Sequence, residues 1–152
     1  MPRYAKIMKN SLSPVQLHKT IRQLSGSEPI TVTVQGECMM PLMENNAKVQ
    51  VTPARWYWPG DVVVALSPGS QYLVHRVIGV YRRSGTCRIL TQADNAARPD
   101  TAVHPDALLG KVSGGSCHPH AVKVPISHRL AATMHFLRFL TSRLLQKSRL
   151  FC

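Results

Sequence analysis

The sequence predicts a mainly β protein: a coiled antiparallel β-sheet with a short helix before it and a basic amphipathic helix after it. Three observations support this fold class. Short strand-like runs, some alternating and one rich in β-branched residues, occupy 30–125, turn-forming residues separate several of them, and little helical pattern lies between them. We therefore divide the chain into an N-terminal basic segment with a short helix (1–29), a β domain (30–126) and a C-terminal helix (127–152). A chain of 152 residues, 44% of them hydrophobic, can bury one such core.

The first predicted element is a short helix that begins at Ser13. Serine is a favoured N-cap residue, and Pro14 suits the first helical position. Apolar residues then recur at helical spacing from Leu17 to Leu24, and Gly26 can end the helix. We expect this helix to pack on the domain through its apolar side.

Seven short strands are predicted next. Turn residues precede or separate them, as at Trp58-Pro59-Gly60 and at the hairpin signal Arg83-Ser84-Gly85. Because so little helix lies between the strands, we expect neighbouring strands to run antiparallel. The predicted strands are Ile30–Gln35, Lys48–Thr52, Asp61–Leu66, Tyr72–Arg82, Thr86–Thr91, Leu108–Ser113 and Ala121–Pro125.

A helical period predicts the last element, over residues 127–150. Basic residues lie beside or opposite its apolar face, whereas Phe136 and Phe139 fall away from that face. Two interpretations stay open: the helix lies on a membrane surface, or it docks on the domain or on a partner. The apolar face consists of Leu130, Met134, Leu137, Leu140, Leu144 and Leu145.

The net charge of +12 is concentrated at the two ends. Residues 1–30 carry a net charge of +4 and residues 117–152 one of +6, against only +2 for residues 31–116. Basic ends can meet nucleic acid, an anionic bilayer or an acidic protein, and charge alone does not choose among them. We do not expect nucleic acid, because the short helix before the sheet forms no helix-turn-helix.

The sequence also indicates where the protein works. There is no run of the roughly 20 apolar residues that span a bilayer, and the N-terminal residues lack the apolar core of a secretory signal. The four cysteines have no paired spacing, which favours reduced thiols. We expect a cytoplasmic protein, either free or peripheral at the inner face of the membrane through residues 127–150. The oligomeric state stays open.

Four side chains could form a catalytic group. A catalytic thiol needs a base within hydrogen-bond reach and a third group that orients the base. Cys38 follows the first predicted strand, His75 lies on a later strand, and Asp94 and Asp100 lie in a polar turn. Each residue taken alone is more often structural, and aspartates in turns commonly bond their own backbone.

Five short blocks, in order, resemble the signal peptidase I family of membrane-associated serine peptidases and its relatives among self-cleaving repressors. The family pattern has a nucleophile block, a P-G-D block, a base block, a G-D-N block and a G-K-V strand. The corresponding blocks in this chain are GECMMP (36–41), PGDVVV (59–64), HRVIG (75–79), ADN (93–95) and LGKVSG (109–114).

The resemblance implies a role for each candidate residue. Cys38 occupies the place of the nucleophilic serine, and its backbone N–H would donate to the oxyanion. His75 occupies the place of the general base, as in the histidine type of the family. Either Asp94 or Asp100 would orient His75. The resemblance also places a substrate groove beside the nucleophile, which would favour small residues before the cut. Its residues would be Gly36, Met39, Met40 and Pro41.

The chain departs from the family pattern in three places. The nucleophile is cysteine, which forms a coherent pair with histidine because an adjacent imidazolium favours the thiolate. Asn45-Asn46 replaces the G-D that usually follows the nucleophile block. Gly36 stands where some relatives place a serine hydroxyl that assists the oxyanion.

We therefore expect an endopeptidase that removes a leader or signal segment from a peptide or protein precursor. The alternative is a non-catalytic scaffold whose basic ends bind a membrane surface or nucleic acid, and self-cleavage is a third possibility. No cofactor or metal is expected, because Cys117-His118-Pro119-His120 has no second ligand cluster to complete a zinc site.

Overall fold

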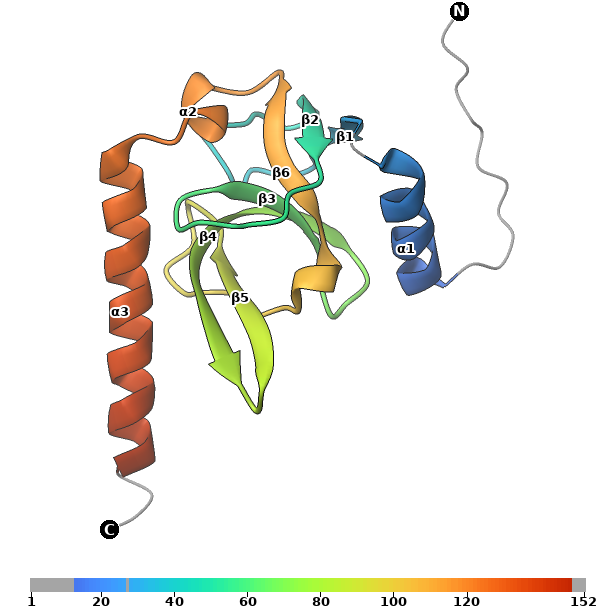
Figure 1. Ribbon diagram of the computed structural model, residues 1–152. Helices are drawn as coiled ribbons and strands as arrows, with labels where there is room; N and C mark the ends of the chain where they lie inside the picture. The colour runs from blue at the N-terminus through green and yellow to red at the C-terminus, as the bar shows by residue number, and fades with distance from the viewer. Residues whose placement is uncertain (1–12, 27, 149–152) are drawn as a thin grey trace, which may run out of the picture.

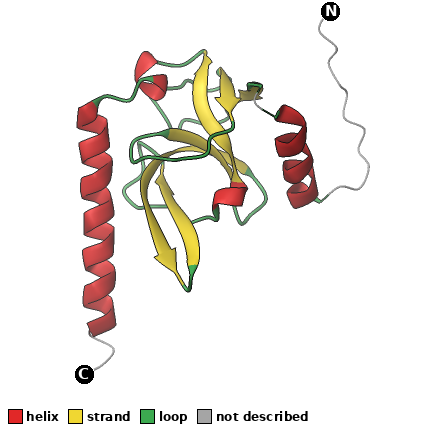
Figure 2. Ribbon diagram, in the orientation of Figure 1, coloured by secondary structure: helices red, strands yellow, loops and turns green. Residues whose placement is uncertain are grey.

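A single open sheet of six strands forms the centre of the molecule, in a computed structural model that describes residues 13–26 and 28–148. A short helix lies at one side of the sheet and a long helix at the other (Figure 1, Figure 2). The spatial order is β1-β2-β6-β3-β4-β5, and every neighbouring pair is antiparallel. The strands are β1 (Ile30–Thr33), β2 (Lys48–Thr52), β3 (Val62–Leu66), β4 (Tyr72–Arg83), β5 (Thr86–Gln92) and β6 (Leu108–Gly115).

The centre of the sheet is β3, whose five residues are all buried between β4 and β6. A continuous β-branched run suits such a strand, because both of its faces are covered. The longest pairing is the β4–β5 hairpin, in which Arg83 lies opposite Thr86. Its turn residues Ser84 and Gly85 both have positive φ, at 50° and 76°, as a tight hairpin turn requires.

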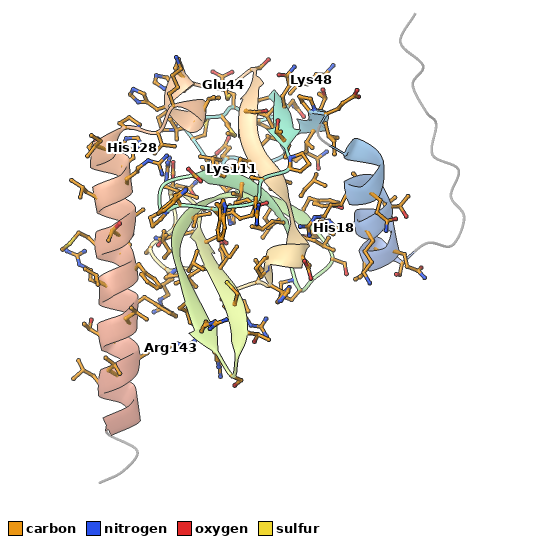
Figure 3. All side chains as sticks on the ribbon, in the orientation of Figure 1. His18, Glu44, Lys48, Lys111, His128 and Arg143 are labelled. Carbon is orange, nitrogen blue, oxygen red and sulfur yellow. The ribbon has the colours of Figure 1, made fainter. Side chains whose placement is uncertain are left out.

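Helix α1 (Pro14–Ser25) begins as predicted. Ser13 and Gln16 form a capping box, in which each side chain accepts a hydrogen bond from the other's backbone N–H. The helix is held to the sheet by His18, which points toward the β domain in Figure 3. The two ring nitrogens of His18 contact the Tyr72 hydroxyl at 3.0 Å and the Asp106 carbonyl oxygen at 2.8 Å.

Helix α3 (Ile126–Ser148) docks on the sheet through the side opposite to its predicted apolar stripe. Phe136 and Phe139 are half-buried and pack against Tyr81 on β4. Ala132 is buried in the same cluster, with Ile78 of β4 and Leu90 of β5. Gly79 permits this close approach, because a Cβ there would overlap the Phe136 ring. Five of the six residues of the predicted apolar face are therefore exposed, and Leu140 is partly buried. Among the described residues, no helix is both long and apolar enough to cross a bilayer.

One predicted strand is wrong. Ala121–Pro125 does not extend the sheet; the chain instead forms helix α2 (Pro119–Val122) and a short link to α3. The reason is local, because the His118 side chain caps the helix and Pro119 occupies its first turn. A short 3-10 helix, η1 (Pro105–Ala107), precedes β6 and was not predicted. The outermost residues of both basic ends, 1–12 and 149–152, lie outside the described residues.

Candidate active site

The five blocks that carry the resemblance, far apart in sequence, contact one another in space. The Cys38 sulfur lies 3.8 Å from the carbonyl oxygen of Val74, the residue directly before the HRVIG block. Arg76 of that block donates to the carbonyl oxygen of Gly60 in the P-G-D block, at 2.8 Å. Asp61 forms an ion pair with Lys111 of the LGKVSG block, at 2.6 Å. The blocks therefore build one continuous region around β4 and β3.

A tight loop between β1 and β2 carries Cys38. The loop is fixed to the ADN block through Asn95, whose side chain donates to the Glu37 carbonyl oxygen at 2.9 Å. The backbone N–H of Asn95 also donates to the Cys38 carbonyl oxygen at 3.4 Å. These two bonds place the thiol at the end of β5, beside β4.

Asn45 and Asn46 stabilise the same loop, where the family pattern has G-D. The Asn45 side chain accepts a hydrogen bond from the Gly36 N–H at 3.0 Å. Asn46 has a φ of 66°, a conformation that asparagine tolerates better than most residues. Its N–H donates to the carbonyl oxygen of Val34 at 2.8 Å. Asn45 and Asn46 therefore stabilise the turn between β1 and β2 without the G-D of the family pattern.

The Cys38 thiol is partly buried, and burial raises its pKa above the ordinary value. The negative charges of Asp100 and Asp94 raise the pKa further, whereas the backbone N–H groups of Cys38 and Met39 oppose the shift. This raised pKa favours the protonated thiol over the thiolate. Among the described residues, no hydrogen bond joins the thiol to the His75 ring in this structure.

Asp100 orients the His75 ring. The Nδ1 atom of His75 lies 2.6 Å from Oδ2 of Asp100, and His75 is only 8% exposed. The same carboxylate oxygen accepts a hydrogen bond from the Thr91 hydroxyl at 2.7 Å, and the Asp100 N–H donates to the Thr91 carbonyl oxygen. Because the carboxylate accepts only, it assigns the ring proton to Nδ1 and leaves Nε2 unprotonated in the neutral ring.

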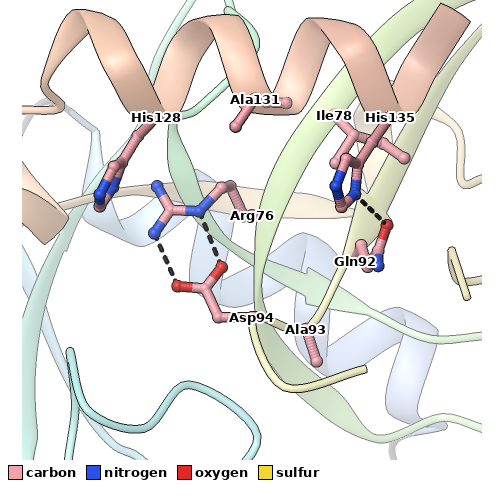
Figure 4. Close-up of a pocket in the computed structure, with 9 residues that line it drawn as sticks. Arg76, Ile78, Gln92, Ala93, Asp94, His128, Ala131 and His135 are labelled. Carbon is pink, nitrogen blue, oxygen red and sulfur yellow. Dashed lines mark hydrogen bonds and ion pairs between the residues drawn. The ribbon is translucent and has the colours of Figure 1, made fainter. Parts of the chain in front are cut away.

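Asp94 does not contact His75. It accepts two parallel hydrogen bonds from the Arg76 guanidinium, both at 2.7 Å (Figure 4). His75 and Arg76 are consecutive on β4, so their side chains point to opposite faces of the sheet. The Arg76–Asp94 pair lines a cavity of about 210 Å³ beneath α3, together with His128 and His135. Of the two aspartates that the sequence left as alternatives, Asp100 therefore contacts His75, and Asp94 contacts Arg76 instead.

The four predicted substrate-binding residues divide into exposed and buried ones. Gly36 is exposed with a φ of 90°, and Met40 is 43% exposed. Met39 is only 1% exposed and packs in the main core, so it supports the loop from below and does not line an open groove. Pro41 lines a separate cavity of about 480 Å³ next to Cys117.

Two residues at the site were missed from the sequence. Thr91 was taken only as the end of a strand, and Asn95 only as part of a block, although both fix catalytic candidates. Strand alternation could have indicated Thr91, because it pairs with Val77 and so shares the face of His75. For metals, no three His, Cys, Asp or Glu side chains are placed to hold an ion within the described part of the chain.

Comparisons with known proteins add no relative to this picture. No family model matches the sequence, and none of the curated proteins matches it closely enough to be a relative.

Proposed function

We propose that the protein is an endopeptidase that removes a leader or signal segment from a peptide or protein precursor. Cys38 is the nucleophile, His75 the base, and Asp100 the residue that orients the base. The observation that carries the proposal is the 2.6 Å bond between His75 and Asp100, on a buried ring next to the residue that the Cys38 sulfur contacts. The five blocks that resemble the signal peptidase I family support the same assignment.

In the first half of the reaction the thiol attacks the scissile carbonyl carbon. The Cys38 side chain turns from the Val74 carbonyl oxygen toward the ring, and Nε2 of His75 takes the thiol proton as the S–C bond forms. Asp100 keeps the ring in the required tautomer and stabilises the imidazolium. The imidazolium then protonates the leaving amine, the C–N bond breaks, and a thioester remains on Cys38.

In the second half water hydrolyses the thioester. Nε2 of His75 takes a proton from the water as its oxygen attacks the thioester carbonyl carbon. When the C–S bond breaks, the imidazolium returns the proton to the sulfur. The leader fragment leaves as a carboxylic acid, and the neutral thiol and imidazole are restored.

Two backbone N–H groups are suited to the negative charge that develops on the substrate oxygen. The N–H groups of Cys38 and Met39 lie close enough to the sulfur to lower its pKa, and neither donates to another oxygen of the described residues. They are therefore free to donate to the oxyanion. No side-chain hydroxyl is needed, which fits glycine at position 36.

The raised pKa of Cys38 selects one form of the mechanism. Burial of the thiol, and then the negative charges of Asp100 and Asp94, raise the pKa of Cys38 and disfavour a resting thiolate. Proton transfer to His75 must therefore accompany the attack, as it does for a serine. This makes the His75–Asp100 pair more important than in a cysteine enzyme that rests as an ion pair.

The proposal is tested with a library of peptides derived from a bacterial proteome. The full chain, Cys38→Ala and His75→Gln are incubated with the library, and new N-termini are identified by mass spectrometry. We expect a set of termini that the wild-type chain alone produces. If Cys38→Ala yields the same termini at the same rate, the cleavage does not use Cys38 and the proposal is wrong.

A further inference from the structure

Helix α3 presents a long apolar face that nothing in the described part of the molecule covers. Its residues lie on the side of the helix away from the sheet, where side chains point outward in Figure 3. Monomeric proteins seldom expose so large a contiguous apolar surface without a use for it. The exposed residues are Ile126 (76%), Leu130 (62%), Met134 (52%), Leu137 (48%), Leu144 (69%) and Leu145 (65%).

This face is not a byproduct of poor docking. The opposite side of α3 is held firmly: Phe136 and Phe139 pack on Tyr81, and Arg129 donates to the Pro59 carbonyl oxygen and to Asp61. Rotating the helix to bury the leucines would break all of these contacts. The outward orientation is therefore a property of the fold.

The polar groups within the apolar face are satisfied inside the helix. Thr133 and Thr141 lie among the exposed leucines, and their hydroxyls donate to the helix carbonyl oxygens of Arg129 and Arg138, both within 3 Å. The face can therefore enter an apolar environment without leaving these hydroxyls unpaired. From Ile126 to Leu145 it runs straight for roughly 29 Å, at 1.5 Å per residue.

The charge around this face is of one sign. Residues 126–148 contain four Lys or Arg and no Asp or Glu. Arg138 is exposed and borders the apolar face at helical spacing. Arginines at such a border extend along the apolar surface and place their charge outside it, where anionic groups can meet it.

We infer that the outer face of α3 docks on an anionic lipid surface, with the helix axis in the plane of the interface. A second copy of the chain is a poorer occupant, because two such faces would bring only positive charges together. The straight apolar face with Arg138 at its border instead matches the boundary between acyl chains and anionic headgroups. The inference does not depend on the proposed peptidase activity, because binding needs no cleavage.

Flotation of the full chain with lipid vesicles tests the inference. The vesicles contain either phosphatidylcholine alone or phosphatidylcholine with phosphatidylglycerol, at low and high salt. We expect binding only to the anionic vesicles, and weaker binding at high salt. The double variant Leu130→Ser/Leu137→Ser should lose about tenfold or more of its binding, because less apolar surface enters the interface.

Matched controls separate the apolar and the charge contributions. Val15→Ser/Val80→Ser removes two exposed apolar residues from α1 and β4, and should bind like the wild type. Arg138→Gln should weaken binding by about fivefold, whereas Arg82→Gln at the hairpin should have a smaller effect. Circular dichroism of each variant establishes that the fold is intact.

Three results would overturn the inference. One is a wild-type chain that does not bind anionic vesicles at low salt. Another is unchanged binding by the Leu130→Ser/Leu137→Ser variant. The third is a wild-type chain that is dimeric in solution, does not bind vesicles, and becomes monomeric in that variant, since the face would then join two copies.

Discussion

His75 and Arg76, consecutive on β4, each form a hydrogen bond and ion pair with an aspartate, on opposite faces of the sheet. His75 bonds Asp100 through one ring nitrogen and keeps the other free of any partner among the described residues. Arg76 bonds Asp94 through two nitrogens and Gly60 through a third, so it is fully engaged. Each pair joins a basic side chain to an aspartate. Only the His75 pair leaves a nitrogen without a hydrogen-bond partner among the described residues.

The difference teaches how one strand can serve structure and chemistry together. Arginine stays charged at every accessible pH, so the Arg76–Asp94 pair is a fixed clamp that ties together the loops beneath α3. Histidine changes its protonation near neutral pH, so a free nitrogen on His75 can accept and return a proton. We therefore propose that the face of β4 with His75 carries the chemistry and that the face with Arg76 carries the structural clamp.

The largest expected effect is on the chemical pair. His75→Gln keeps a donor for Asp100 and removes the base, so cleavage of any substrate should fall about a thousandfold or more. The midpoint of urea unfolding should stay near that of the wild type. His104→Gln, at an exposed position, is the control and should retain activity. Equal cleavage by His75→Gln and wild type would remove His75 from the mechanism.

Breaking the Arg76–Asp94 pair should lower the stability of the protein. Arg76→Met leaves the Asp94 carboxylate without its partner and the Gly60 carbonyl without its donor, so the free energy of unfolding should fall by about 3–5 kcal/mol. Urea denaturation measures this. Arg82→Met, at an exposed position of the same strand, should change the value by less than about 0.5 kcal/mol. If both variants change the free energy of unfolding by a similar small amount, the Arg76–Asp94 pair does not stabilise the fold.

The docking of α3 covers the face of the sheet on which Arg76 lies, and Gly79 tests that docking. Gly79→Ala puts a methyl group into the space of the Phe136 ring, so it should destabilise the protein by about 1–3 kcal/mol. Gly69→Ala is the control, because its nearest neighbour, the Ser67 hydroxyl oxygen, lies 3.7 Å from the added carbon. If Gly79→Ala is as stable as the control, α3 does not pack closely on β4.

The smallest effect distinguishes the two aspartates by their action on Cys38. Alkylation of Cys38 by iodoacetamide, followed by mass spectrometry, should accelerate with pH around a midpoint above the ordinary cysteine pKa, because burial raises the pKa of this thiol. Removing a nearby negative charge lowers that pKa, and Asp100 contributes more than Asp94. Asp100→Asn should therefore lower the midpoint more than Asp94→Asn. An ordinary cysteine midpoint in the wild type would contradict this account.

Local signals were sufficient for much of the fold. Ser13 caps α1 as predicted, and alternation, a β-branched run and turn signals together located every strand of the sheet to within two residues at each end. The exception, Ala121–Pro125, failed because the cap at His118 and the proline after it outweigh a short alternating run. Here a helix start and a strand pattern lie next to each other in the sequence, and the capping rules could have identified the helix.

Two features that depend on contacts between distant parts of the chain could not be predicted from the sequence. The choice between Asp94 and Asp100 follows from how the chain folds back along β5, where Asp100 bonds Thr91 and Val103 bonds Ile89. The outward face of α3 follows from the space that Gly79 leaves for Phe136, 57 residues further along the chain. Periodicity located the apolar stripe and could not say which side of the helix meets the sheet.

The most direct test of the central claim compares Asp100→Asn with Asp94→Asn in the peptide-library assay, together with their unfolding midpoints. The account predicts that Asp100→Asn loses about a hundredfold or more of the Cys38-dependent cleavage while its midpoint changes little. It also predicts that Asp94→Asn unfolds more easily and keeps its cleavage per folded molecule. Loss of cleavage in Asp94→Asn, with full cleavage in Asp100→Asn, would contradict the assignment of chemistry to the His75 face.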